Sequence, residues 1–176
     1  TEWKAIMEAN HNFPSIVVWV PFNEAWGQFK TEEIVKWTKD FDPSRLVNTA
    51  SGGNFHKAGH IMDIHNYPEP VMRIIVLGEY GGLGLPLEGH TWQAKDNWGY
   101  QSFANKEELL SKYESFISRF DALIEMGLSA AVYTQTTDVE IETNGLMTYD
   151  RKVIKMPAQR LYEIHQRLYN ARLVTM

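Results

Sequence analysis

Short apolar runs rich in β-branched residues alternate along this chain with longer stretches of helical periodicity. A run of this length and composition is typical of a strand that is buried on both faces. The pattern predicts strands at residues 16–22, 46–50, 61–65, 74–78 and 129–134. It predicts helices at residues 2–9, 31–40 and 106–126, and a last helix from Pro157 onward. Strands that alternate with helices indicate an α/β fold with a mainly parallel sheet.

Capping and helix-breaking residues suggest where these helices begin and end. Trp3, Ile6 and Met7 are spaced to share one face of the first helix. Thr31 is the predicted N-cap of the second helix, because threonine oxygens accept hydrogen bonds from the first helical N–H groups. Gly127 is predicted to end the third helix. Pro157 suits the first turn of the last helix, where a missing N–H costs nothing.

Two segments between the predicted elements have no regular pattern. Residues 83–104 form a predicted loop that carries Trp92 and Trp98, which we expect to shape a ligand pocket or to pack as a lid on the rim of the domain. The acidic residues around Asp138 are expected in a solvated loop, with contact of Asp138 to a ligand hydroxyl as the alternative.

Composition narrows the function classes. The chain has 176 residues, 44% of them apolar and 22% charged, which is ordinary for one globular domain. The net charge of -5 and the lack of a basic run argue against a nucleic-acid or anionic-membrane partner. There are no cysteines, which excludes disulfides and thiolate metal sites. No run approaches the roughly 20 apolar residues of a membrane span. The compartment stays open, and a soluble periplasmic or secreted parent is compatible with the sequence.

Two glutamates follow predicted strands. Glu24 ends "VVWVPFNE", and Glu79 lies in "IIVLGEYGG". Parallel strands end at the same edge of a sheet, so both carboxylates are expected to face one cavity. Paired carboxylates there suit glycoside hydrolysis. The alternative is that each glutamate is a buried partner of an arginine or of a helix end.

A cluster of potential metal ligands follows the second predicted strand: His56, His60, Asp63 and His65. Gly59 interrupts any helix that would align the first two histidines, and the spacing matches no diagnostic ligand set. We therefore expect loop and strand-end histidines, with no metal and no cofactor.

Five motifs resemble glycoside hydrolase family 2, in the family's order and over nearly the whole chain. "NHNFPSIVVWVPFNE" is similar to the region that leads to the acid/base glutamate, and "LGEYGG" to the nucleophile strand. "FDPSRLVNTASGG" and "MDIHNYP" resemble the fifth and sixth strand regions, and "SAAVYTQTTDVEIETNGLMTYDR" resembles the eighth.

The resemblance implies a (β/α)₈ TIM-barrel fold of which this chain holds only a part. Residues 1–176 would supply strands 4 to 8, the C-terminal part of the catalytic barrel, while the N-terminal domains and strands 1 to 3 would be absent. The strand at 16–22 would then have an unpaired edge, so we expect the chain to self-associate through it. We also expect it to be inactive alone.

Residue roles are implied by position in the motifs. Glu24 matches the acid/base and Glu79 the nucleophile of a retaining double displacement. Asn23 would bind the sugar 2-hydroxyl, and Tyr67 would hydrogen-bond the nucleophile. Tyr133 replaces the tryptophan that the family usually places beneath the sugar. Some family members use a divalent cation near the site, and nothing in this sequence supports one.

The predicted function is therefore hydrolysis of a β-linked carbohydrate, as in β-galactosidases, β-glucuronidases or β-mannosidases. One alternative is a non-catalytic carbohydrate-binding barrel, which would need neither glutamate. Another is a structural fragment without a competent site.

Overall fold

A computed structural model describes residues 2–24, 27–53, 56–70 and 76–169. It divides into two compact units, Thr1–His65 and Asn66–Met176, which are described separately below.

Parallel strands organise the first unit. Its elements are α1 (Glu2–Asn10), β1 (Val18–Trp19), α2 (Thr31–Phe41), β2 (Leu46–Val47) and β3 (Asp63–His65). β1 and β2 pair in parallel, with Val18 opposite Leu46. A parallel bridge between Asn48 and Ile61 adds the segment that continues into β3. The parallel arrangement of the first three predicted strands is therefore confirmed.

The regular strands are shorter than predicted. The segment 16–22 forms a strand only at Val18–Trp19, and the segment 46–50 only at Leu46–Val47. Pro21 has no N–H to donate to a ladder, which limits β1. Backbone hydrogen bonds nevertheless join the two segments as far as Ser51 N–H to the carbonyl of Phe22, at 2.9 Å. The two chain segments therefore stay together up to their C-terminal ends.

A small apolar core holds α1 and α2 against β1 and β2. Met7, Trp19, Val35 and Val47 are all buried in it. The predicted face of α1 is only partly correct, because Ile6 is 49% exposed while Met7 is fully buried. Adjacent residues of a helix point about 100° apart, so Met7 can face the core while Ile6 points away from it.

The ends of α2 differ in how well the sequence predicted them. Its N-cap is Lys30, in a left-handed conformation with φ 45°, and no side chain caps the helix there. The prediction of Thr31 as N-cap is wrong, since Thr31 is the first helical residue and is buried. The C-terminal end is as predicted: α2 ends at Phe41 and Asp42 is the C-cap.

The described residues of the second unit form two pairs of parallel strands and two helices. Its elements are β4 (Val76–Gly81), β5 (Leu83–Gly84), β6 (Gln101–Ser102), α3 (Lys106–Glu125), β7 (Ala130–Thr134) and α4 (Ala158–Tyr169). β4 pairs with β7 in parallel, with Gly81 opposite Thr134. The strand predicted at 74–78 continues to Gly81, and its first two residues lie outside the described part of the chain.

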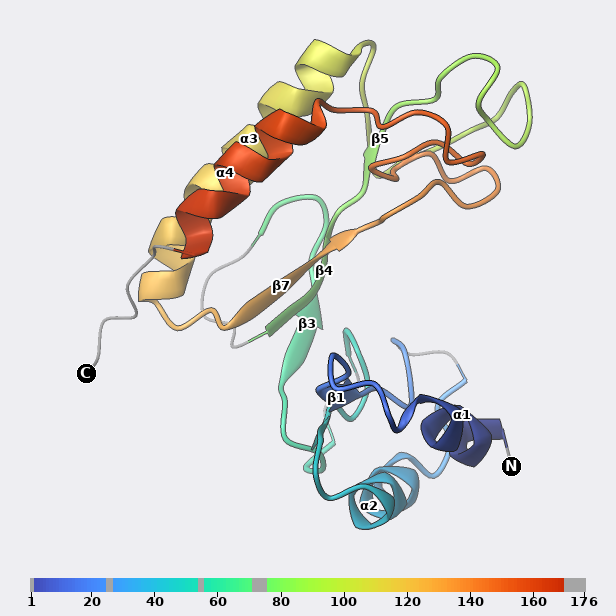
Figure 1. Ribbon diagram of the computed structural model, residues 1–176, viewed down its shortest axis with the longest axis vertical. Helices are drawn as coiled ribbons and strands as arrows, with labels where there is room; N and C mark the ends of the chain where they lie inside the picture. Colours follow the sequence, from blue (N-terminus) through green and yellow to red (C-terminus); the bar gives the residue numbers. More distant parts are fainter. Residues whose placement is uncertain (1, 25–26, 54–55, 71–75, 170–176) are drawn as a thin grey trace. The chain divides into compact units, whose positions relative to one another are not determined.

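α3 and α4 run alongside each other (Figure 1) and cover one side of this unit. The Tyr113 hydroxyl on α3 lies 2.9 Å from Nε2 of His165 on α4. Tyr80 of β4 packs edge-on against Phe116 and Phe120 of α3. Gly127, with φ 105°, directly follows the C-cap of α3, as the sequence predicted.

The segment 83–104 contains structure that the sequence did not predict. β5 and β6 lie at its two ends and pair in parallel, with Leu83 opposite Gln101. Gly84 and Gly99 approach so closely that a Cβ on Gly99 would lie 2.7 Å from the Cα of Gly84. Only glycine permits this contact. The spacing of apolar residues along the sequence does not reveal it.

The acidic segment near residue 138 is partly internal. Asp138 is 3% exposed, and its carboxylate accepts a hydrogen bond from Lys155 Nζ at 2.6 Å. Burial raises the pKa of Asp138 and lowers that of Lys155, and their contact opposes both effects. The expectation of a solvated loop is therefore wrong for Asp138, which is a buried ion-pair partner.

The molecule is thus of the α/β type, with parallel strands and helices, as predicted. The described residues do not close a barrel. Within the same part of the chain, no helix is long and apolar enough to cross a membrane.

Candidate active site

Glu24 lies where the parallel segments of the first unit end. It lies two residues after Phe22, whose carbonyl accepts a hydrogen bond from the segment that follows β2. One carboxylate oxygen of Glu24, Oε2, lies 2.8 Å from Nδ1 of His65, the last residue of β3. The Glu24 side chain is 48% exposed, whereas that of His65 is 4% exposed. A solvent-accessible carboxylate is therefore held by a buried imidazole.

Behind His65, a chain of hydrogen bonds leads into the unit. His65 Nε2 lies 2.8 Å from Ser51 Oγ. The Ser51 hydroxyl donates to Asp63 Oδ2 at 2.9 Å, and Asn48 Nδ2 donates to the same oxygen at 2.5 Å. Asp63 and Asn48 are both 4% exposed. The contacts of His65 thus reach from the exposed Glu24 to a buried carboxylate.

Asn23 stands next to Glu24 at the surface. Its side chain is exposed, and its backbone carbonyl accepts a hydrogen bond from Gln28 Nε2 at 3.1 Å. This position leaves its amide accessible to a ligand.

Glu79 lies within β4 of the second unit and is half-buried. The Tyr67 hydroxyl donates a hydrogen bond to Glu79 Oε2, and its oxygen lies 3.1 Å from Thr134 Oγ1 at the end of β7. Burial and the neighbouring Glu79 carboxylate raise the pKa of Tyr67 well above its usual range. Tyr67 therefore keeps its proton and remains a donor to Glu79.

Aromatic rings extend from Tyr67 toward solvent. The Tyr67 ring stacks on Tyr100, with centroids 4.1 Å apart and an interplanar angle of 4°. Trp98 packs edge-on against Tyr100 at 5.4 Å and is 41% exposed. The structure therefore brings Trp98 into the same group of rings as Tyr67. Trp92 instead packs against Tyr149 at 4.9 Å.

Tyr133 lies among aromatic side chains of the protein. It is half-buried and packs edge-on against Tyr80 and Tyr113. A Cβ on Gly81 would lie 2.4 Å from its ring, so this glycine lets the ring approach the end of β4. Burial raises the pKa of the Tyr133 hydroxyl. These contacts favour a packing role for Tyr133.

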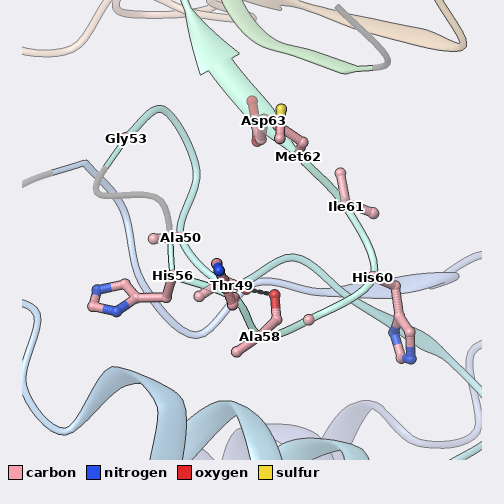
Figure 2. A pocket seen from close by; sticks show the side chains of 11 residues that line it. Thr49, Ala50, Gly53, His56, Ala58, His60, Ile61, Met62 and Asp63 are labelled. Atoms are coloured by element: carbon pink, nitrogen blue, oxygen red, sulfur yellow. Dashed lines mark hydrogen bonds between the residues drawn. The ribbon is translucent and has the colours of Figure 1, made fainter.

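The histidines considered as metal ligands have protein partners. His60 Nδ1 accepts a hydrogen bond from the Val47 N–H at 2.9 Å, and His56 Nδ1 lies 3.6 Å from a Glu32 carboxylate oxygen. Both histidines are among the residues that line a cavity of about 240 Å³. Figure 2 shows their imidazoles on opposite sides of this group of residues, pointing in different directions. Among the described residues, no group of three or more histidine, aspartate or glutamate side chains is placed to hold a metal ion.

Reasoning from sequence alone missed two residues that contact the candidate carboxylates or their partners. Ser51 lies in "TASGG", directly after a predicted strand, and that position is the only signal in the sequence for its strand-end hydrogen bond. Tyr100 was one of several aromatics in a long loop. No local pattern pairs either residue with its partner, because both contacts join segments that are distant in sequence.

A family model matches the N-terminal part of the chain. Residues 2–80 match the model of the family described as glycosyl hydrolases family 2, TIM barrel domain. This segment includes Glu24, Tyr67 and Glu79. No curated protein matches the chain closely enough to count as a relative. The match over residues 2–80 agrees with the family that the motifs indicated.

Proposed function

We propose that this chain carries the two catalytic glutamates of a retaining glycosidase that acts on a β-linked carbohydrate. Glu24 is the acid/base and Glu79 the nucleophile. The observation that carries the proposal is the contact of Tyr67 with Glu79, because a donor held at one carboxylate oxygen orients the other toward a substrate.

The reaction follows from these roles. Glu24 donates its proton to the glycosidic oxygen while a Glu79 oxygen attacks the anomeric carbon. The bond to the leaving group breaks, and an alcohol departs. Water then attacks the same carbon, its proton returns to Glu24, and the bond to Glu79 breaks. Two inversions at one carbon retain its configuration.

Further residues bind the sugar in this proposal. Asn23, exposed beside Glu24, donates to the 2-hydroxyl, an interaction that strengthens in the transition state. Exposed Trp98 and Trp92 offer ring faces to sugar rings. Tyr133 takes the family's position beneath the sugar only if it leaves its present packing.

We also propose that residues 1–176 supply strands 4 to 8 of the catalytic barrel and that turnover needs the complete parent protein. In that barrel the carboxyl groups of Glu24 and Glu79 lie about 5–5.5 Å apart, the spacing of a retaining pair. A separation of about 6.5–9.5 Å would indicate inversion instead.

The test is turnover of a panel of nitrophenyl β-glycosides by the parent protein and its variants. Glu79→Gln abolishes turnover of every substrate. Glu24→Ala slows substrates with poor leaving groups by about 10²–10⁴-fold and spares those whose leaving group needs no proton. Glu88→Gln, an exposed glutamate in the segment 83–104, is the matched control and leaves all rates unchanged. Equal losses for both classes of leaving group in Glu24→Ala would contradict the acid role.

A further inference from the structure

The contacts around His65 determine which of its nitrogens carries a proton. The single hydroxyl proton of Ser51 is donated to the Asp63 carboxylate, which can only accept. Ser51 Oγ must then accept from His65, so Nε2 of the imidazole carries hydrogen. Nδ1 faces Glu24, and it accepts or donates the hydrogen bond between them according to whether the Glu24 carboxyl group carries a proton.

The backbone also encloses the ring. Gly52 follows Ser51 with φ 83°, and a Cβ there would lie 2.3 Å from Cγ and Nδ1 of His65. No other residue fits this position, because both the left-handed conformation and the space require glycine. Ser51 and Gly52 thus form a slot that sets the plane of the imidazole.

We propose that His65 is the positioning residue of Glu24 and that Ser51, Asp63 and Asn48 set its tautomer for that task. The inference rests on the proposed acid/base role of Glu24. When Glu24 is protonated, its O–H donates to Nδ1. When one proton sits on Nδ1 instead, the imidazolium donates to the Glu24 carboxylate. The same hydrogen bond therefore holds the Glu24 side chain in one orientation with the shared proton at either end.

Proton balance over the reaction is simple. The Glu24–His65 pair holds one proton between Oε2 and Nδ1 before the reaction. That proton leaves the pair for the departing oxygen, so in the covalent intermediate no hydrogen bond joins Oε2 and Nδ1, since both can then only accept. The attacking water returns one proton to the pair and restores the hydrogen bond. Nε2 keeps its hydrogen throughout, because Ser51 and Asp63 do not change.

The first experiment measures the tautomer in this chain by NMR with ¹⁵N-labelled histidine, using His65→Asn to assign the resonances. The expected spectrum shows Nε2 protonated. Ser51→Ala, which removes one oxygen, redistributes the proton between the two nitrogens. Thr49→Val is the matched control, since the Thr49 hydroxyl donates to the backbone carbonyl of Ala58 and not to this chain of contacts. A neutral His65 protonated at Nδ1 in the unsubstituted chain would overturn the proposal.

The second experiment measures leaving-group dependence in the parent protein. An asparagine amide occupies the place of Nδ1, and a glutamine amide that of Nε2. His65→Gln therefore slows substrates with poor leaving groups about 10–100-fold more than those with good ones, and His65→Asn recovers most of that loss. His60→Asn, which keeps an acceptor for the Val47 N–H, is the matched control.

The outcomes separate this inference from the proposed function. If Glu24→Ala shows no leaving-group dependence, the proposed function fails whatever His65 does. If Glu24→Ala shows the dependence while His65→Gln slows all substrates equally, or slows none, His65 is structural and this inference alone is overturned.

Discussion

Each candidate carboxylate is held by a ring that contributes one polar atom. His65 contacts Glu24, and Tyr67 contacts Glu79. Rings lose little conformational entropy when they are ordered and are easily fixed by packing, as the stack of Tyr67 on Tyr100 shows. A carboxylate oriented by a rigid partner is prepared for reaction before substrate arrives.

Tyr67→Phe tests this arrangement at a single atom. The variant keeps the stack on Tyr100 and removes only the hydroxyl that donates to Glu79. A hydrogen bond to a charged group contributes about 1.5–3 kcal/mol, so kcat/KM of the parent protein should fall about 10–100-fold. Steady-state kinetics measure the loss, and Tyr162→Phe, an exposed tyrosine of α4, is the control. Unchanged kinetics in Tyr67→Phe would show that this hydrogen bond does not support the reaction.

At the scale of elements, one buried carboxylate ties the end of α2 to the strands beside it. Asp42, 2% exposed, accepts hydrogen bonds from Trp19 of β1 at 2.8 Å and from Arg45 at 2.6 Å. Burial alone would raise the pKa of Asp42, but hydrogen bonds from Ser44, Trp19 and Arg45 outweigh it and hold the pKa well below its usual range. Folding therefore stabilises the ionised form of the Asp42 carboxyl group.

Asp42→Asn should destabilise the chain most at neutral pH. A depressed folded-state pKa adds stability that is present above the unfolded value, near pH 4, and is lost as the pH falls further. Removing one partner of such a buried pair costs about 3–5 kcal/mol of unfolding free energy at pH 7. The difference from the unsubstituted chain should shrink below about pH 4, because asparagine does not titrate.

Urea unfolding at pH 7 and at pH 3 measures this difference. Asp40→Asn is the control, because Asp40 pairs with Lys36 at the surface, with its side chain 63% exposed. A loss of stability in Asp42→Asn that is the same at both pH values would mean that the charge of Asp42 is not what holds α2 to β1.

At the scale of the whole molecule, the edge of β1 and the exposed apolar residues beside it bear on whether the chain self-associates. β1 pairs with β2 on one side within the described residues, while Val17 is 64% and Val20 41% exposed. An uncovered strand edge has unpaired backbone N–H and C=O groups, which can pair with a strand of another chain.

We therefore expect this chain by itself to self-associate and to show little or no hydrolysis of nitrophenyl glycosides. Light scattering should report a mass that is a multiple of 20.3 kDa. Val17→Lys should shift the population toward monomer, whereas Tyr162→Lys, at an exposed position of helix α4, should not. A monomeric chain with robust turnover would contradict both expectations.

Much of the fold was predictable from the sequence because the signals are local. Apolar periodicity and helix-ending residues located α1, α2, α3 and the start of α4 to within one or two residues. The parallel pairing of β1 and β2 followed from the helix between them. β5 and β6 were missed because their pairing joins residues about 18 apart through close glycine contacts that have no period.

The candidate site divides in the same way. Glu24, Tyr67 and Glu79 could be named from the sequence because they sit in short motifs, and the same motifs indicated the family whose model matches residues 2–80. Only the tertiary structure decided what those residues touch. His65 and Glu24 are 41 positions apart, and the sequence predicts His65 only as a strand-end histidine, whereas in the structure its two nitrogens lie beside Glu24 and Ser51. A side chain's partners depend on which distant segments the core brings together, and no local pattern of residues carries that information.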